Sequence, residues 1–229
     1  MEIYNNCAEI NNQRQALLMK KQRLGKDALM MVFLPIYVIM FIVAEKLITA
    51  DYWVSWCILD DYIPFVKEFV FIYVLWYPLM IGFALWLLWK DRRAFRRYGW
   101  ATIIGLTSCV VIFFILPSGQ DLRPELTGTD IASNVLRGIY SADTNTNVLP
   151  SMHVVGSLAA MCAAFDTDSI KKKWLRWGIC ILSILINAST VLIKQHSILD
   201  IFAGIALFAI IFPFVYIIPE KRRKKKASQ

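Results

Sequence analysis

Long apolar runs separated by short polar segments fill this chain from residue 29 to residue 219. A helix needs about 20 apolar residues to cross a bilayer. Six runs come close to or reach that length, and they lie near 29–49, 69–89, 99–117, 150–166, 174–193 and 197–219. The fourth and shortest run begins at Pro150, and proline suits a first helical position because its missing N–H would be unpaired there. The pattern predicts an all-α, integral-membrane bundle of six transmembrane helices.

Polar segments flank this membrane domain at 29–219. Residues 1–28 mix leucines with lysines and arginines, which predicts a cytoplasmic N-terminal segment that lies at the membrane interface. They lack the short apolar core and cleavage site of a signal peptide, so we expect the first apolar run to be retained. Residues 220–229 predict a basic cytoplasmic tail.

The basic residues predict the orientation of the bundle. Twenty of the 25 lysines and arginines fall in the two terminal segments and in the loops near 90–97 and 171–176. In a six-span arrangement these segments share one side, which the positive-inside rule makes cytoplasmic. Both termini are therefore predicted inside. The opposite side keeps Lys46, Lys67, Arg123, Arg137 and Lys194.

The amino-acid composition excludes several classes of protein and site. The chain is 58% hydrophobic, which excludes a soluble domain. The net charge of +8 follows from the juxtamembrane loops and their attraction to anionic lipid, so we predict no nucleic-acid partner. Five scattered cysteines without a C-x-x-C pair and only two histidines predict neither a disulfide frame nor a metal site, and no cofactor. The aromatic and acidic segment 51–67 is typical of a membrane interface.

Both histidines fall beside predicted outer helix ends. His196 and Asp200 are four residues apart, a spacing that places them on one helix face. A carboxylate there accepts a hydrogen bond from one imidazole nitrogen and directs the other outward, an arrangement that makes a nucleophile. An ionisable residue inside a membrane helix is costly unless it is paired or faces a polar cavity, so Asp200 indicates a site. The alternative is that Asp200 only favours the helix N-terminus.

A second polar group precedes the fourth run. His153 follows Ser151 at a predicted helix N-terminus, where free backbone N–H groups and the helix dipole favour an anion. A phosphate bound there would have His153 as proton donor to a leaving oxygen. Arg123 and Lys194 lie close in sequence to the predicted site and supply positive charge for phosphate. For Lys194, a solvated lysine at a helix end remains an alternative.

Three segments carry a family resemblance. They are "LRP" at 122–124, "PSMH" at 150–153 and "STVLIKQHSILD" at 189–200. In order and spacing they resemble the three motifs of the type 2 phosphatidic acid phosphatase superfamily, which includes the vanadium haloperoxidases. The resemblance implies that His196 attacks phosphorus to form a phosphohistidine, Asp200 orients it and His153 protonates the leaving group. It also implies that water then releases phosphate without a metal. We expect Ser151, Ser189, Arg123 and Lys194 to bind the substrate phosphate.

Three positions depart from the family motifs. Leu116 stands where the family has a lysine, Met152 where it has a glycine, and Thr190 where it has an arginine. Two of three family cations are missing, and we hypothesise that Lys194 replaces one. The reduced set resembles the branch with sphingomyelin synthases and inositol phosphorylceramide synthases, which transfer a headgroup to a second lipid.

The predicted function is a membrane lipid phosphatase acting on a phosphate or diphosphate monoester at the outer leaflet. Candidate substrates are isoprenyl diphosphates, phosphatidic acid and phosphatidylglycerophosphate. The alternatives are a headgroup phosphotransferase with the same triad, and a channel, transporter or inactive lipid-binding scaffold. The predicted partners are a lipid phosphate and the bilayer, and the predicted location is a bacterial plasma membrane with an extracytoplasmic site. The oligomeric state stays open.

Overall fold

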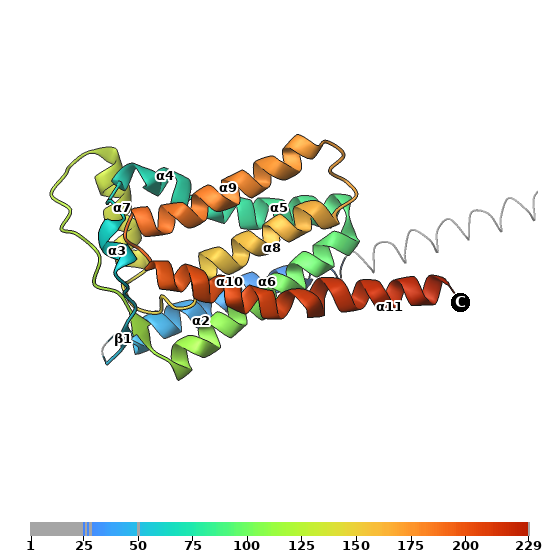
Figure 1. The fold of residues 1–229 in the computed structure, drawn as a ribbon, viewed down its shortest axis with the longest axis horizontal. Coiled ribbons are helices and arrows are strands. Elements are labelled where there is room, and N and C mark those ends of the chain that lie inside the picture. Colours follow the sequence, from blue (N-terminus) through green and yellow to red (C-terminus); the bar gives the residue numbers. More distant parts are fainter. Residues whose placement is uncertain (1–24, 26, 28, 50, 229) are drawn as a thin grey trace, which may run out of the picture.

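Long helices packed side by side make up most of the protein (Figure 1). The computed structural model describes residues 25, 27, 29–49 and 51–228, so the prediction for 1–28 lies almost wholly outside the described residues. The longer helices are α2 (Phe33–Leu47), α5 (Trp76–Lys90), α6 (Arg92–Ile115), α7 (Ile131–Ala142), α8 (Met152–Asp166), α9 (Lys173–Leu192), α10 (Ile198–Phe212) and α11 (Ile218–Ala227).

Five helical stretches are long and apolar enough to cross a bilayer. They are Leu29–Leu47, Lys67–Lys90, Arg92–Ile115, Lys173–Leu192 and Ile198–Lys225. The other predicted span forms α8, whose 15 residues rise only about 22 Å, less than the about 30 Å of a hydrocarbon core. The helical membrane bundle is therefore confirmed, while the count of six full spans stays a prediction.

The last span is longer than its apolar pattern predicts. α10 passes through a π-helical turn, η3 (Pro213–Ile217), directly into α11. The residues predicted as a separate tail from 220 onward thus begin as a continuation of the last helix. A π-helical turn is expected at Pro213, since proline removes one backbone donor and displaces the hydrogen-bond ladder.

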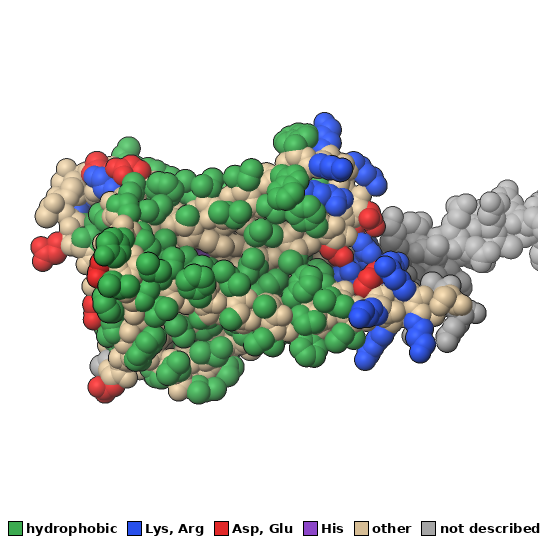
Figure 2. All heavy atoms as spheres, viewed as in Figure 1, with side chains coloured by type: hydrophobic (Ala, Val, Ile, Leu, Met, Phe, Trp, Pro, Cys, Tyr) green, Lys and Arg blue, Asp and Glu red, His purple; other side chains and the backbone are tan. Residues whose placement is uncertain are grey.

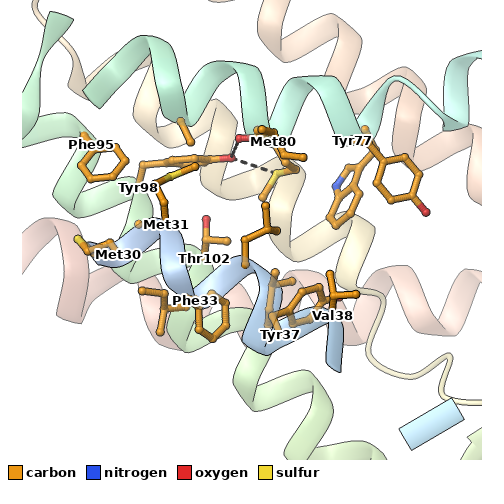
Figure 3. A pocket seen from close by; sticks show the side chains of 17 residues that line it. Met30, Met31, Phe33, Tyr37, Val38, Tyr77, Met80, Phe95, Tyr98 and Thr102 are labelled. Atoms are coloured by element: carbon orange, nitrogen blue, oxygen red, sulfur yellow. Dashed lines mark hydrogen bonds between the residues drawn. The ribbon is translucent and has the colours of Figure 1, made fainter. Parts of the chain in front are cut away.

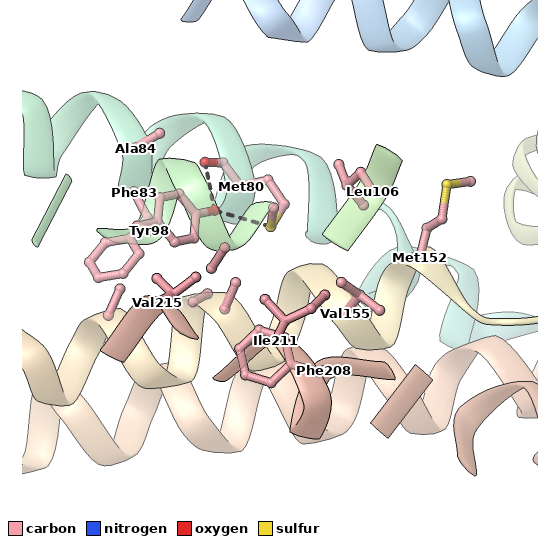
Figure 4. Packing of buried hydrophobic residues seen from close by; sticks show 14 of the residues in the cluster. Met80, Phe83, Ala84, Tyr98, Leu106, Met152, Val155, Phe208, Ile211 and Val215 are labelled. Atoms are coloured by element: carbon pink, nitrogen blue, oxygen red, sulfur yellow. Dashed lines mark hydrogen bonds between the residues drawn. The ribbon is translucent and has the colours of Figure 1, made fainter. Parts of the chain in front are cut away.

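The short helix α8 forms the centre of the bundle. Ten of its 15 residues are buried, and it packs against α5, α6, α9 and α10. Its alanines, serine and glycine allow neighbouring helices to approach closely, as small residues do in membrane proteins. A Cβ atom on Gly204 of α10 would lie 3.0 Å from the carbonyl oxygen of Ser151. Figure 4 shows Val155 of α8 facing Phe208 and Ile211, within the main core cluster.

The surface divides into an apolar side and two polar ends (Figure 2). Lysines and arginines gather at the end formed by α11 and the α8–α9 loop, which we call the basic end. Arg97 there is half-buried and forms ion pairs with Asp166, at 2.6 Å, and Glu220, at 2.8 Å. This separation of charge supports the predicted orientation, which itself stays a prediction.

Short elements and loops build the opposite end, which we call the histidine end. They are β1 (Trp53–Val54), α3 (Leu59–Tyr62), η2 (Lys67–Phe69), α4 (Val70–Tyr73) and β2 (Ser118–Gly119). β1 and β2 pair in parallel, with Trp53 opposite Ser118. The amphipathic helix α7 lies at the same end and was not predicted, because the apolar-run criterion detects only spans long enough to cross a bilayer.

Candidate active site

His196 and Asp200 meet at the start of α10. Nδ1 of His196 lies 3.1 Å from Oδ2 of Asp200. His196 is 6% exposed and Asp200 is fully buried. The predicted pair is therefore formed, but the predicted shared helix face is wrong, because α10 begins at Ile198 and His196 lies before it.

A capping box brings the two side chains together. Ser197 is the N-cap of α10, and its backbone N–H donates to Oδ2 of Asp200 at 2.9 Å. Asp200, at the third helical position, satisfies an unpaired donor of the helix start while it also accepts from His196. The two hypotheses for Asp200, that it stabilises a helix N-terminus and that it orients His196, are therefore not exclusive, because one carboxylate makes both contacts.

A tight turn after α9 places His196. The backbone N–H groups of Gln195 and His196 both donate to the carbonyl of Thr190, at 2.8 and 3.1 Å, and that of Lys194 donates to Val191. Lys194 has a φ of 55°, the left-handed conformation that usually takes glycine in a Schellman turn. His196 is therefore fixed by the end of one span and the start of the next.

The side chain of Lys194 is tied to another loop. Its ammonium donates to the carbonyl oxygens of Asp60 and Ile63, at 2.8 and 2.7 Å. Lys194 is 9% exposed, which excludes the reading of a freely solvated lysine at a helix end. Its predicted role as a phosphate ligand stays a prediction.

His153 lies in the first turn of α8, as the sequence predicts. The N-cap is Ser151, whose backbone N–H donates to the carbonyl of Asp200 at 3.0 Å. This contact joins the start of α8 to the first turn of α10 and brings the two imidazole rings to a centroid distance of 5.6 Å. The histidines, 43 positions apart in the chain, thus form one site.

Aromatic rings enclose His153. The ring centroids of Tyr73 and Trp76 lie 4.6 and 4.7 Å from that of His153, which is 5% exposed. Trp76 also donates from Nε1 to the carbonyl of His153 at 3.2 Å, and Tyr73 donates to a carboxylate oxygen of Asp143 at 2.7 Å. These contacts fix the ring of His153 without using its nitrogens.

Several buried polar atoms on this side of the site have no partner among the described residues. They are both ring nitrogens of His153, Oγ of Ser151 and, one turn along α8, Oγ of Ser157. Buried polar groups are nearly always hydrogen-bonded in native proteins, so a cluster of unpaired ones needs an explanation. A polar ligand bound beside His196 would satisfy those at the helix start.

Arg123 reaches the site through protein contacts. Its guanidinium donates to the carbonyls of Tyr140, Asp143 and Thr144 and to Oε1 of Gln195, at distances from 2.5 to 3.1 Å. Burial lowers the pKa of Arg123. Arg123 therefore holds the side chain of Gln195, the residue directly before His196. Its contact with a substrate phosphate stays a prediction.

The remaining motif positions serve the helices. Ser189 donates to the carbonyl of Ile186 at 2.6 Å, within α9. Met152 accepts from the hydroxyl of Tyr37 through its sulfur. Leu116 is exposed at the end of α6 and supplies no charge.

The loop before Pro150 is held by Glu45, whose carboxylate accepts from Asn147 at 2.6 Å and from the backbone of Thr144 at 2.9 Å.

Sequence reasoning missed the contribution of the 51–63 loop. Ser55 donates to Oδ1 of Asp200 at 2.5 Å, and Asp60 accepts from the hydroxyl of Ser197 and the backbone of Ile198. Both side chains are buried. The sequence gives only a weak indication of these contacts. Asp60 lies among aromatic residues, and this mixture is also typical of a segment at a membrane interface.

The arrangement is suited to nucleophilic chemistry. Asp200 occupies Nδ1 of His196, so Nε2 is the imidazole nitrogen left for a ligand, and the ring of His153 lies next to it at a centroid distance of 5.6 Å. A nucleophile with an orienting carboxylate and a nearby proton carrier needs such an arrangement. Among the residues that the structure describes, no group of three or more His, Cys, Asp or Glu side chains is placed to hold a metal ion. Independence from metals stays a prediction.

Comparison with known proteins identifies the family. The family model of the PAP2 superfamily matches residues 44–214, which include both histidines, Asp200 and all three predicted motifs. Neither the curated proteins nor the solved structures gave a match. On this match and on the geometry around His196, the chain belongs to the PAP2 superfamily, the type 2 phosphatidic acid phosphatase superfamily that its three motifs resemble.

Proposed function

We propose that this protein is an integral-membrane lipid phosphatase that hydrolyses a phosphate or diphosphate monoester through a phosphohistidine. The superfamily indicates phosphatase-type activity at a membrane. The observation that carries the finer proposal is the contrast at the site: Nδ1 of His196 is bound to Asp200, while both nitrogens of His153 and Oγ of Ser151 are buried without partners among the described residues.

The reaction proceeds in two displacements. Nε2 of His196 attacks phosphorus, the P–N bond forms, and the bond to the leaving oxygen breaks as His153 donates a proton to it. Water then attacks the phosphohistidine, His153 accepts a proton from that water, and the P–N bond breaks to release inorganic phosphate. Asp200 stabilises the positive charge on His196 during each attack.

The α8 N-terminus supplies the anion site in this proposal. Its first backbone N–H groups lack helical partners and point along the helix axis, where the dipole favours negative charge. Ser151 adds a hydroxyl donor. We place the site at the outer leaflet because the basic end, at the other end of the bundle, carries the lysines and arginines typical of a cytoplasmic face.

An apolar cavity supports a lipid as the substrate. A cavity of about 210 Å³ lies between α2, α5 and α6, lined by residues such as Phe33, Tyr37, Met80 and Tyr98 (Figure 3). Trp76 lines this cavity and also packs against the ring of His153. A hydrocarbon chain in the cavity would thus place its headgroup beside the two histidines.

Filling the cavity tests this role. Ala84 lines the cavity from α5, and Ala84→Leu is expected to raise KM several-fold for long-chain lipid phosphates but not for a short-chain, water-soluble phosphate. Gly82→Leu is the matched control, because Gly82 is exposed and a Cβ atom there meets no atom of the described residues within 4 Å. Equal effects of the two variants on both substrates would contradict a chain in the cavity.

The decisive experiment measures inorganic phosphate release by the detergent-purified protein. Isoprenyl diphosphates, phosphatidic acid and phosphatidylglycerophosphate are offered with a metal chelator, beside His196→Ala. We expect chelator-resistant release that the variant lacks, and a phosphorylated protein that is labile in acid on rapid quenching. Release that persists in His196→Ala would contradict the proposal.

One observation favours a second candidate, a headgroup phosphotransferase. The site is poor in free cations, since Leu116 and Thr190 replace two family cations and Arg123 is bound to four protein acceptors. A diester headgroup carries less negative charge than a terminal phosphate and needs fewer cations. Such an enzyme would form product only with an acceptor lipid present and would release little phosphate.

A further inference from the structure

The 51–63 loop reaches across the site from the connection between α2 and α4. Its backbone is anchored to the segment after α6, because Trp53 donates to Pro117 at 2.9 Å and Ser55 to Gly119 at 2.7 Å. These bonds frame the parallel pair of β1 and β2. Ser55 is thereby held at one backbone position, with its side chain fully buried.

The hydroxyl of Ser55 completes the environment of Asp200. It donates to Oδ1 at 2.5 Å, while Oδ2 accepts from the backbone of Ser197 and from His196. With three donors, the carboxylate is fixed in one orientation. Without Ser55, Oδ1 would be a buried acceptor with no partner, and the carboxylate would be free to rotate toward other donors.

Resting on the phosphatase function proposed above, we propose that Ser55 is a positioning residue, which acts on His196 through Asp200. A carboxylate can hold a histidine in one direction only if other hydrogen bonds hold the carboxylate itself. Ser55 supplies such a bond to Asp200, which in turn orients His196. The same loop adds Asp60, which accepts from Ser197 at 2.6 Å and from Ile198 at 2.8 Å, so the start of α10 is held from two points.

Variants that keep or remove the hydroxyl test the role of Ser55. Ser55→Ala and Ser55→Val are expected to lower kcat about tenfold or more with KM within threefold of wild type, because substrate binding does not involve Oδ1. Ser55→Thr, which matches valine in shape but keeps the hydroxyl, is expected to restore kcat to within threefold. Ser183→Ala is the matched control, since it removes a buried serine hydroxyl that has no partner in the described chain.

The outcomes separate this inference from the proposed function. If wild type releases phosphate and His196→Ala does not, the function stands whatever Ser55 does. A kcat for Ser55→Ala within twofold of wild type would then overturn the positioning role, as would equal kcat values for folded Thr and Val variants. If valine and threonine prevent folding, the alanine variant alone decides, with thermal unfolding in detergent confirming its fold.

Discussion

The two histidines of the site have opposite surroundings. Nδ1 of His196 is bound to a carboxylate that itself accepts from Ser55 and Ser197, whereas both nitrogens of His153 are buried without a partner in the described chain. Protein groups thus complete the hydrogen bonding on one side of the site and leave it incomplete on the other.

This difference supports the roles proposed for the two histidines. A nucleophile must hold one tautomer and one direction, which requires fixed partners. A proton donor to a leaving oxygen must keep its nitrogen free for the substrate, so its ring is positioned by packing alone, between Tyr73 and Trp76. Substitutions at these residues test that division of roles, from the largest expected effect to the smallest.

Removing the nucleophile should have the largest effect. His196→Ala is expected to lower kcat by about 10⁴-fold or more, because the proposed covalent intermediate forms on this imidazole. Phosphate release and trapping of the phosphoprotein measure it. A variant that still becomes phosphorylated would show that His196 is not the attacked residue.

Removing the proton donor should depend on the leaving group. His153→Phe is expected to lower kcat/KM, which reports only the first displacement, by about 10²–10⁴-fold for an alkyl phosphate, the usual contribution of a general acid. The loss should shrink strongly for an aryl phosphate whose leaving oxygen needs no proton. Initial rates with the two substrates provide the test, and an equal loss for both would contradict the assigned role.

Changing the orienting carboxylate should lower the rate less than losing the nucleophile. Asp200→Asn is expected to reduce kcat by about 10²-fold or more, because an amide favours the wrong tautomer of His196. Nitrogen NMR shifts of the labelled imidazole report the tautomer directly. Unchanged shifts together with full activity would remove Asp200 from this role.

The same two histidines should respond oppositely in stability. His153→Phe removes two buried nitrogens that have no partner within the described part of the chain, and is expected to raise the free energy of unfolding by about 1–3 kcal/mol. His196→Phe takes a donor from buried Asp200 and is expected to lower it by a similar amount. Thermal unfolding in detergent compares them, and shifts of the same sign would contradict the contrast.

Lys194 should show the smallest effect. Lys194→Ala is expected to lower turnover several-fold, because the lysine contacts the 51–63 loop beside the site through the carbonyls of Asp60 and Ile63. Lys46→Ala, at an exposed position on α2, is the control. Phosphate release measures both, and turnover of Lys194→Ala equal to that of the control would exclude Lys194 from the site.

Much of the fold followed from apolar runs, whereas parts of the site did not. Run length identified the helical bundle because the bilayer sets a minimum span, and α8 was already the shortest run. The pairing of His196 with Asp200 was predicted correctly, but the reason given for it, a shared helix face, is wrong. His196 lies just before the N-cap of α10 and Asp200 is part of the capping box, and this geometry also brings together residues that are four positions apart. Ser55 and Asp60 were missed because their contacts join residues about 140 positions apart.

The sequence by itself determined the helical membrane architecture, the family and the identity of the His, His and Asp group, because hydrophobic length and motif spacing are local properties. The tertiary structure alone decided which polar groups are paired and which are left open. It placed Arg123 and Lys194 against backbone carbonyls and brought Ser55 to Asp200. These contacts form between helix ends and loops that are far apart in the sequence. A local sequence pattern does not predict which of these segments pack together.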